Sequence, residues 1–131
     1  MKKRINVVGA VLRRDGKILC ARRSEKMSLP LMWEFPGGKI ELEETPEQAL
    51  KRELAEELRI EAVVGEKIET TEYEYDFGVV VLTTFYCAIQ DGAPQLTEHA
   101  EIRWVEPSQL DTLQWAPADI PAVEKIMKAA G

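Results

Sequence analysis

The chain has 131 residues, 45% of them hydrophobic and 31% charged, which is ordinary for one soluble globular domain spanning residues 1–131 and too short for two. Its formal net charge of −6 argues against a nucleic-acid polymer as partner, because proteins that bind such polymers present basic patches. A small polyphosphate is compatible with this charge if metal ions lie between it and the protein. The sequence has no apolar run of 18 residues, so we expect no transmembrane helix and no membrane partner.

The N-terminal part predicts a β-hairpin. Residues 4–12 are apolar and β-prone, residues 13–16 (RRDG) are a turn signal, and residues 17–22 form the returning strand. No small-residue cleavage site follows the apolar stretch, so we expect a strand rather than a signal peptide. Cys20 and Cys87 lie in separate strand-like runs and form neither a disulfide framework nor a zinc motif, which fits a reducing cytoplasm.

The second strand ends at two arginines, and a polar loop over residues 24–31 follows. Arg22 or Arg23 is a candidate phosphate ligand, because a guanidinium group binds anions in a bidentate manner. The alternative for either residue is a solvated surface charge.

Residues 33–60, WEFPGGKIELEETPEQALKRELAEELRI, carry the strongest pattern in the chain. Gly37 and Gly38 predict a turn, which a short extended run follows. Thr45 is a good N-cap, Pro46 suits the first helical position, and Gln48 completes a capping box. Helical spacing of four apolar residues predicts one buried face, formed by Ala49, Leu50, Leu54 and Leu58.

Three glutamates of this helix, Glu53, Glu56 and Glu57, fall within an arc of roughly 100°. Carboxylates this close repel each other unless a cation lies between them. One interpretation is a solvated acidic helix face. The other is a site for Mg²⁺, which binds carboxylates and substrate phosphates, with the glycines allowing a backbone carbonyl to approach.

The rest of the chain predicts three further strands and two helices. Strand signals begin at residues 62–64 and continue over 66–76, where Tyr73 and Tyr75 share one face, before a turn at 76–78. Residues 79–89 form a nearly all-apolar strand suited to the middle of a sheet, and residues 102–105 form another. A short helix opens at residues 106–107, and an amphipathic helix begins near Ile120. These elements predict an α/β protein of the α+β type, with a mixed β-sheet sandwiched between helices.

The central stretch resembles the Nudix box, written G-x5-E-x7-R-E-U-x-E-E-x-G-U with U apolar. The matching residues are Gly38, Glu44, Arg52, Glu53, Leu54, Glu56, Glu57, Leu58 and Ile60. The one departure is Arg59, which stands where the pattern has glycine. Arginine there is strained by roughly 1 kcal/mol or the helix ends differently. We expect a changed helix exit and intact carboxylates.

The resemblance to MutT-type Nudix hydrolases implies Mg²⁺-dependent hydrolysis of a nucleoside triphosphate to monophosphate and pyrophosphate, with Mn²⁺ as a possible substitute. It implies metal ligation by Glu53, Glu56 and Glu57 with a backbone carbonyl at Gly38 or Lys39. It also implies that Glu98, in a loop before a strand, is an additional carboxylate, the alternative being a solvated loop glutamate, and that either Glu98 or Glu53 is the general base. Arg52 would orient Glu53, and Glu44 would support the site from behind the metal ligands. Arg23 and Lys39 would bind phosphate, and the lone His99 is expected to be structural.

The nucleobase would lie against Phe35, Tyr75 and Asp119, although Phe35 equally suits the core and Asp119 equally suits a helix N-cap. If Asp119 meets the base as an ionised acceptor, cytosine or an oxidised purine is favoured over ordinary guanine. Two alternatives remain: a Nudix enzyme for ADP-ribose or dinucleoside polyphosphates, and a nucleotide-sensing module without catalysis. We expect a monomer or a homodimer.

Overall fold

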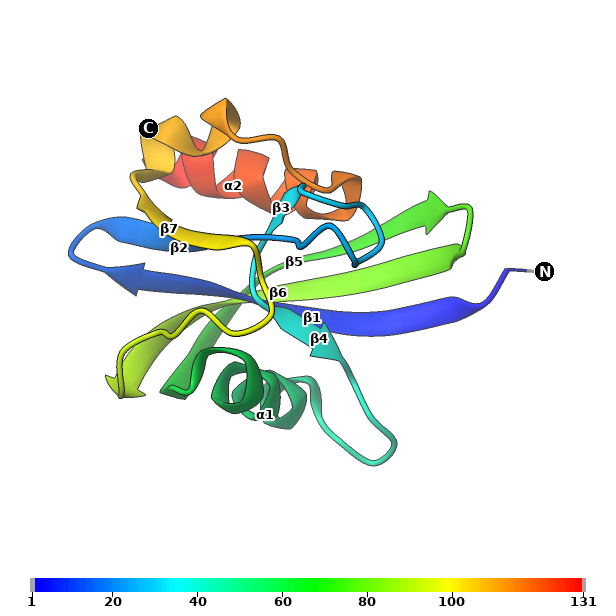
Figure 1. Ribbon diagram of the computed structural model, residues 1–131, viewed down its shortest axis with the longest axis horizontal. Coiled ribbons are helices and arrows are strands. Elements are labelled where there is room, and N and C mark those ends of the chain that lie inside the picture. The colour runs from blue at the N-terminus through cyan, green and yellow to red at the C-terminus, as the bar shows by residue number, and fades with distance from the viewer. Residues whose placement is uncertain (1, 131) are drawn as a thin grey trace.

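The strands of the computed structural model, which describes residues 2–130, form a mixed sheet between two α-helices (Figure 1). The strands are β1 (Arg4–Arg14), β2 (Lys17–Arg22), β3 (Trp33–Glu34), β4 (Gly37–Lys39), β5 (Glu61–Tyr75), β6 (Gly78–Asp91) and β7 (Glu101–Val105). The helices are α1 (Pro46–Leu58) and α2 (Ile120–Ala130), and the short 3₁₀ helices are η1 (Pro107–Thr112) and η2 (Pro117–Asp119). The predicted fold class is therefore confirmed.

Strand β1 organises the sheet. It runs parallel to β6, and the remaining strand pairs are antiparallel, in the order β3-β2-β1-β6-β5 with β4 paired to β1 and β7 paired to β2. Strand β6 lies between β1 and β5, so the prediction that its apolar run occupies the middle of the sheet is confirmed. The first hairpin has a shorter turn than predicted, because β1 continues to Arg14 and only Asp15 and Gly16 form the turn.

Alternate residues of β1 supply the two sides of the core. Val8, Ala10 and Leu12 are buried in the cluster that includes the apolar face of α1. Val11 is buried in the other cluster, with Trp33, Phe35, Trp115 and three residues of α2. Because side chains of a strand alternate between faces, one strand serves both layers, and α1 and α2 lie on opposite sides of the sheet in Figure 1.

Helix α1 begins as the sequence predicts. Thr45 accepts a hydrogen bond from the Gln48 N–H, and the Gln48 side chain accepts one from the Thr45 N–H. The predicted apolar face, Ala49, Leu50, Leu54 and Leu58, is fully buried. The prediction of a changed helix exit is wrong: Arg59 adopts the left-handed conformation, with φ 59° and ψ 38°, and donates its N–H to the Leu54 carbonyl. The capping bond and the buried Leu58 and Ile60 on either side hold the arginine in the conformation that glycine usually supplies.

The two glycines before α1 do not form the predicted turn. Gly37 and Gly38 belong to β4, which pairs with β1, and neither has positive φ. A Cβ on Gly37 would overlap the Val8 carbonyl, and a Cβ on Gly38 would overlap the Glu53 carboxylate. The glycines are therefore explained by close approach of a strand and of a carboxylate rather than by turn geometry.

Among residues 2–130, no helix has the length and apolar character needed to cross a bilayer.

Candidate active site

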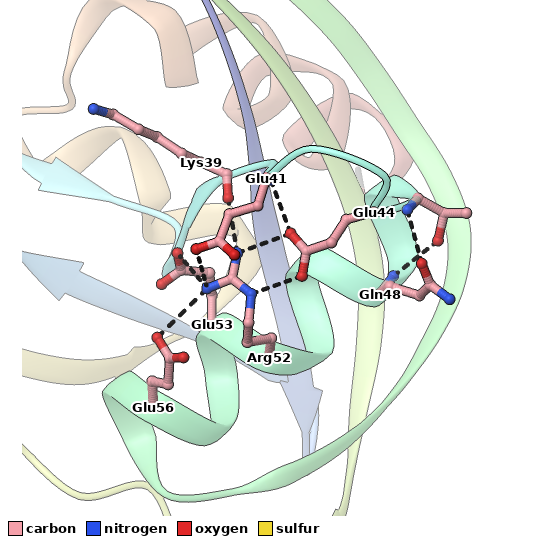
Figure 2. Close-up of polar contacts among 8 residues, drawn as sticks. Lys39, Glu41, Glu44, Gln48, Arg52, Glu53 and Glu56 are labelled. Atoms are coloured by element: carbon pink, nitrogen blue, oxygen red, sulfur yellow. Dashed lines mark hydrogen bonds and ion pairs between the residues drawn. The ribbon is translucent and has the colours of Figure 1, made fainter.

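Arg52 lies at the centre of a group of glutamates that we call the Arg52 cluster: Glu41, Glu44, Glu53 and Glu56 (Figure 2). The guanidinium group donates to both carboxylate oxygens of Glu44, at 2.7 and 3.0 Å. Its Nη1 lies 3.3 Å from Glu53 Oε2 and 3.5 Å from Glu56 Oε2. One cation of the box thus lies among carboxylates that would otherwise repel each other.

The Arg52 cluster holds Glu44 in its ionised form. The hydrogen bond from Arg52, with a second from the Glu41 N–H, lowers the pKa of Glu44 to about 2. Glu53 is deeper, and its burial raises the pKa of that carboxyl despite the opposing charge of Arg52. Glu53 is therefore the more basic of the two carboxylates that Arg52 contacts most closely.

Glu57 is separated from this cluster and lines a pocket instead. Its Oε1 is buried and has no hydrogen-bond partner among the described residues. Burial raises the pKa of Glu57 to about 8, and the positive charge of His99 opposes that shift only in part. An unpartnered, buried carboxylate oxygen is costly unless something absent from the protein chain binds it.

Two features of this region fit a hard divalent cation. The unpartnered Oε1 of Glu57 is an oxygen ligand of the right kind, and the missing Cβ of Gly38 leaves the Glu53 carboxylate room beside the backbone. In the present side-chain positions, the described residues contain no group of three or more His, Cys, Asp or Glu that could hold a metal ion. Arg52 contacts Glu53 and Glu56, and Glu56 is exposed. The donor atoms suit such a cation in kind, but Glu53 and Glu56 do not converge with Glu57 here.

Glu98 lies in the loop between β6 and β7 and is exposed. This loop is attached to the end of α1, because Thr97 Oγ1 donates to the Glu57 carbonyl at 2.5 Å and the Gln95 N–H donates to the Leu58 carbonyl at 2.9 Å. The predicted additional carboxylate is thus carried on a segment attached to the predicted metal ligands, although its side chain faces solvent.

A pocket of about 520 Å³ brings the two halves of the predicted site together. Its lining includes Gly38, Lys39 and Glu57 from the box region and Phe35, Tyr75 and Asp119 from the predicted base site. Glu53, Glu56 and Glu98 do not line it. A volume of this size can hold a nucleotide.

Asp119 is buried at the end of η2, and its carboxylate does not cap α2. Its Oδ2 accepts a hydrogen bond of 3.0 Å from the N–H of Phe35, 84 residues away in the chain. Burial raises the pKa of Asp119 well above the ordinary value, so the neutral acid is favoured. Beside it, the Tyr75 hydroxyl accepts from the Ala118 N–H at 2.8 Å. Phe35 both lines the pocket and packs in the core, with its ring centroid 4.7 Å from that of Trp115.

The predicted phosphate ligands are placed differently from each other. Arg23 lines the pocket, but its Nε and Nη2 donate to Ser28, and its Nη1 donates to Glu34 at 2.5 Å. Lys39 extends its side chain away from the Arg52 cluster, while its carbonyl accepts from Arg52 Nη2 at 3.0 Å (Figure 2). Arg22, the alternative to Arg23, donates to the Leu31 carbonyl outside the pocket lining.

Sequence reasoning missed Glu34 and Phe77, and it did not predict the partner of His99, which was expected only to be structural. Phe77, which was assigned only to a turn, lines the pocket and stacks on Tyr75 with ring centroids 5.1 Å apart. The sequence signal for Phe77 is an aromatic residue within a predicted tight turn. In the structure this residue is half-exposed. Glu34 and His99 contact each other, and burial opposes protonation of the imidazole, but Glu34 outweighs it and raises the pKa of His99. Nothing in the local sequence pairs residues 65 positions apart.

Comparisons with known proteins agree with this geometry. The family described as NUDIX domain matches residues 2–126. The chain is 42% identical to the protein named CTP pyrophosphohydrolase from Escherichia coli (strain K12), covering 95% of this chain and 93% of that one. It is 36% identical to the 8-oxo-dGTP diphosphatase of Haemophilus influenzae (strain ATCC 51907 / DSM 11121 / KW20 / Rd), covering 96% and 93%. The solution NMR structure of DNA mismatch repair protein MutT (family Nudix hydrolase) from methicillin-resistant Staphylococcus aureus 252 superposes with a TM-score of 0.81 at 61% identity, covering 98% of this chain and 99% of that one. With its box intact at every carboxylate and its sheet and helices arranged in the same way, the chain belongs to the Nudix hydrolase family.

Proposed function

We propose that this protein hydrolyses nucleoside triphosphates to the monophosphate and pyrophosphate, with a divalent metal such as Mg²⁺ or Mn²⁺ as cofactor. The observation that carries the proposal is the single pocket that connects Glu57 and Gly38 of the box with Asp119 and Tyr75. The similarity to a CTP pyrophosphohydrolase and to an 8-oxo-dGTP diphosphatase supports this class of substrate.

Hydrolysis at phosphorus depends mainly on positioning and on neutralising charge. Glu53, Glu56 and Glu57, with the Gly38 carbonyl and Glu98, would hold the metal, which when bound neutralises phosphate charge and acidifies a water molecule. Arg52 holds Glu53 in place, and Glu44 in turn fixes Arg52 through two hydrogen bonds. Glu53 is our preferred residue to accept the proton of the water, because Arg52 holds its carboxylate and burial raises its pKa above the usual value. Arg23 and Lys39 remain the proposed phosphate ligands, and Arg23 must release Ser28 or Glu34 to act as one.

A neutral Asp119, the form that its burial favours, would change the argument for base selection without changing its outcome. A carboxylic acid offers one donor and one acceptor, which complement N3 and the N4 amine of cytosine. The same pair complements O6 and the additional N7–H of an 8-oxo-guanine. Ordinary guanine presents two acceptors at O6 and N7, so one of them stays unpaired against the acid. Tyr75, Phe77 and Phe35 would contact the plane of the base.

The test is one assay of the purified protein with Mg²⁺ against CTP, dCTP, 5-methyl-dCTP, 8-oxo-dGTP and dGTP, with separate measurement of monophosphate and pyrophosphate. We expect turnover of the cytosine or oxidised-purine nucleotides above dGTP. Release of inorganic phosphate instead of pyrophosphate would contradict the reaction. Turnover of ADP-ribose or a dinucleoside polyphosphate alone would contradict the substrate class.

The cellular setting belongs to the same proposal. Cys20 and Cys87 are both buried as free thiols, which is compatible with the reducing cytoplasm where nucleotide pools lie. We propose a monomer or homodimer that acts on a small nucleotide and not on a nucleic-acid polymer. Light scattering and salt-dependent binding to single-stranded DNA test these two points.

A further inference from the structure

His99 is a deeply buried ionisable side chain that the proposed reaction leaves without a role. Its side chain is 1% exposed, and its Nε2 lies 2.9 Å from Glu34 Oε2. The two residues come from different parts of the fold, since Glu34 ends β3 and His99 lies just before β7. Strands β3 and β7 do not pair with each other but both pair with β2, so this contact adds a side-chain link between the segments on either side of β2.

Glu34 connects His99 to the wall of the pocket. Its Oε1 accepts from Arg23 at 2.5 Å, while its Oε2 contacts the histidine ring. Arg23 in turn donates to Ser28 in the loop after β2. Glu34, Arg23 and Ser28 all line the pocket, so His99 holds one end of a chain of hydrogen bonds along that wall.

The loop that carries His99 also carries Glu98. Backbone hydrogen bonds attach this loop on both sides, from the Gln95 N–H to the Leu58 carbonyl at 2.9 Å and from the Ala100 N–H to the Arg22 carbonyl at 2.8 Å. Between these two attachments, the His99 ring points inward and the Glu98 side chain faces solvent. The direction of the buried ring therefore determines where the neighbouring carboxylate lies.

We propose that His99 is a positioning residue that links the two halves of the site, holding Glu34 against the nucleotide pocket and the Glu98 loop beside α1. This inference rests on the proposed function for its catalytic consequence, but the arrangement of the loop can be tested without catalysis. A histidine that only filled space in the core would be replaceable by an apolar residue of similar size. A positioning residue would be replaceable only by one that reaches Glu34.

The first test compares His99→Leu with His99→Gln. Leucine keeps the volume and loses the hydrogen bond, whereas the glutamine amide can still reach Glu34. We expect kcat/KM for the best nucleotide to fall about tenfold in His99→Leu and to recover to within about threefold of wild type in His99→Gln. Adding Glu34→Gln to His99→Leu should lower kcat/KM by less than about threefold more, because both changes act on the Glu34–His99 contact and glutamine keeps an oxygen that can accept from Arg23. Thr84→Val is the matched control, because Thr84 is a buried polar residue that does not line the pocket. The substitution removes one hydrogen bond, from the Thr84 hydroxyl to the Glu69 carbonyl. It should leave kcat/KM unchanged even if it lowers the melting temperature.

The second test measures amide hydrogen exchange without substrate or metal. We expect faster exchange at Gln95 and Ala100 in His99→Leu, near wild-type exchange in His99→Gln, and no change there in Thr84→Val. Loss of kcat/KM in both histidine variants in proportion to their melting temperatures would overturn the inference, and so would independent, multiplying effects of His99→Leu and Glu34→Gln. Unchanged exchange in the loop of His99→Leu would also overturn it. If the wild-type protein hydrolyses no nucleotide, the proposed function fails, while the exchange measurements still decide whether His99 holds the loop.

Discussion

Two groups of carboxylates lie close together in this protein, and different interactions set their pKa values. In the Arg52 cluster near the surface, one guanidinium contacts four glutamates, and the pKa of Glu44 is lowered to about 2. In the pocket, Glu57 and Asp119 are buried, and the pKa of each is raised, that of Glu57 to about 8. The hydrogen bond from an arginine lowers the pKa of Glu44, whereas burial raises the pKa of Glu57 and of Asp119.

The difference has a consequence for the metal-free protein. Glu44 gains from ionisation, whereas Glu57 has a buried oxygen with no partner and gains from protonation until a cation approaches. A cation in the pocket would reverse the preference of Glu57 and leave that of Glu44 nearly as it is. The pocket carboxylate is therefore the one whose replacement should separate function from stability.

The largest expected effect is that of Glu57→Gln on turnover. If Glu57 is a metal ligand, kcat should fall by about 10³-fold or more, since charge stabilisation at phosphorus is lost while the fold remains. The matched control is Glu47→Gln, an exposed glutamate in the first turn of the same helix, which should keep wild-type turnover. In the wild type, EDTA should abolish turnover and Mg²⁺ or Mn²⁺ should restore it. Near wild-type turnover of Glu57→Gln would contradict metal ligation by Glu57, and full turnover in excess EDTA would contradict the mechanism.

The same residue should make a separable contribution to the pH dependence of stability in EDTA. Below its unfolded-state pKa of about 4.3, Glu57 is protonated in both states. As pH rises toward the folded-state pKa of about 8, the unfolded chain releases this proton first, so the free energy of unfolding falls. In urea melts, we expect Glu57 to lower the free energy of unfolding by roughly 3 kcal/mol between pH 5 and pH 8. This contribution should be absent in Glu57→Gln.

Glu44→Gln is the contrasting variant for that measurement. The stability that Glu44 contributes is present above its unfolded-state pKa and lost only as pH falls toward its folded-state pKa of about 2. Replacing Glu44 should therefore leave unchanged the slope of the free energy of unfolding against pH between pH 5 and pH 8. Equal slopes in wild type and Glu57→Gln would mean that the Glu57 carboxyl is not held in the protonated form by the fold.

Asp119 should show the next largest effect, on the choice of base. Asp119→Asn keeps one donor and one acceptor, so the order of kcat/KM among CTP, 8-oxo-dGTP and dGTP should persist within about threefold. Asp119→Ala removes both groups and should lower the preference over dGTP by about tenfold or more. A reversed preference in Asp119→Asn would show that the acid binds the base in its ionised form.

The two carboxylate groups also differ in how far the sequence could predict them. Local sequence, within about four positions, determines helix α1, its N-cap, its buried face and the spacing of its glutamates. The structure confirms these predictions. Strand β6 was placed in the middle of the sheet from its composition alone. The pocket was only partly predictable, because Glu34 meets His99 and Phe35 meets Asp119 through the sheet topology, across 65 and 84 residues. The turn predicted at Gly37 and Gly38 was wrong because glycine also permits close approach, which depends on Val8 and Glu53.

The smallest expected effect is that of Arg59→Gly, and it tests the end of the helix on which both carboxylate groups depend. Arg59 has φ 59°, a conformation that glycine adopts without steric strain, but glycine also has more freedom in the unfolded chain. These two terms nearly cancel, so we expect a neutral to stabilising change of at most about 1 kcal/mol in a denaturant melt. Arg59→Ala is the matched control, because it removes the exposed side chain and keeps the left-handed backbone, and it should change stability by only a few tenths of a kcal/mol. If both variants destabilise the protein equally, the arginine side chain makes the stabilising contact. If only Arg59→Gly does, the freedom of the unfolded chain outweighs the strain. In either variant, turnover should match wild type, because Arg59 lies outside the pocket lining and its N–H bond to the Leu54 carbonyl does not need a side chain.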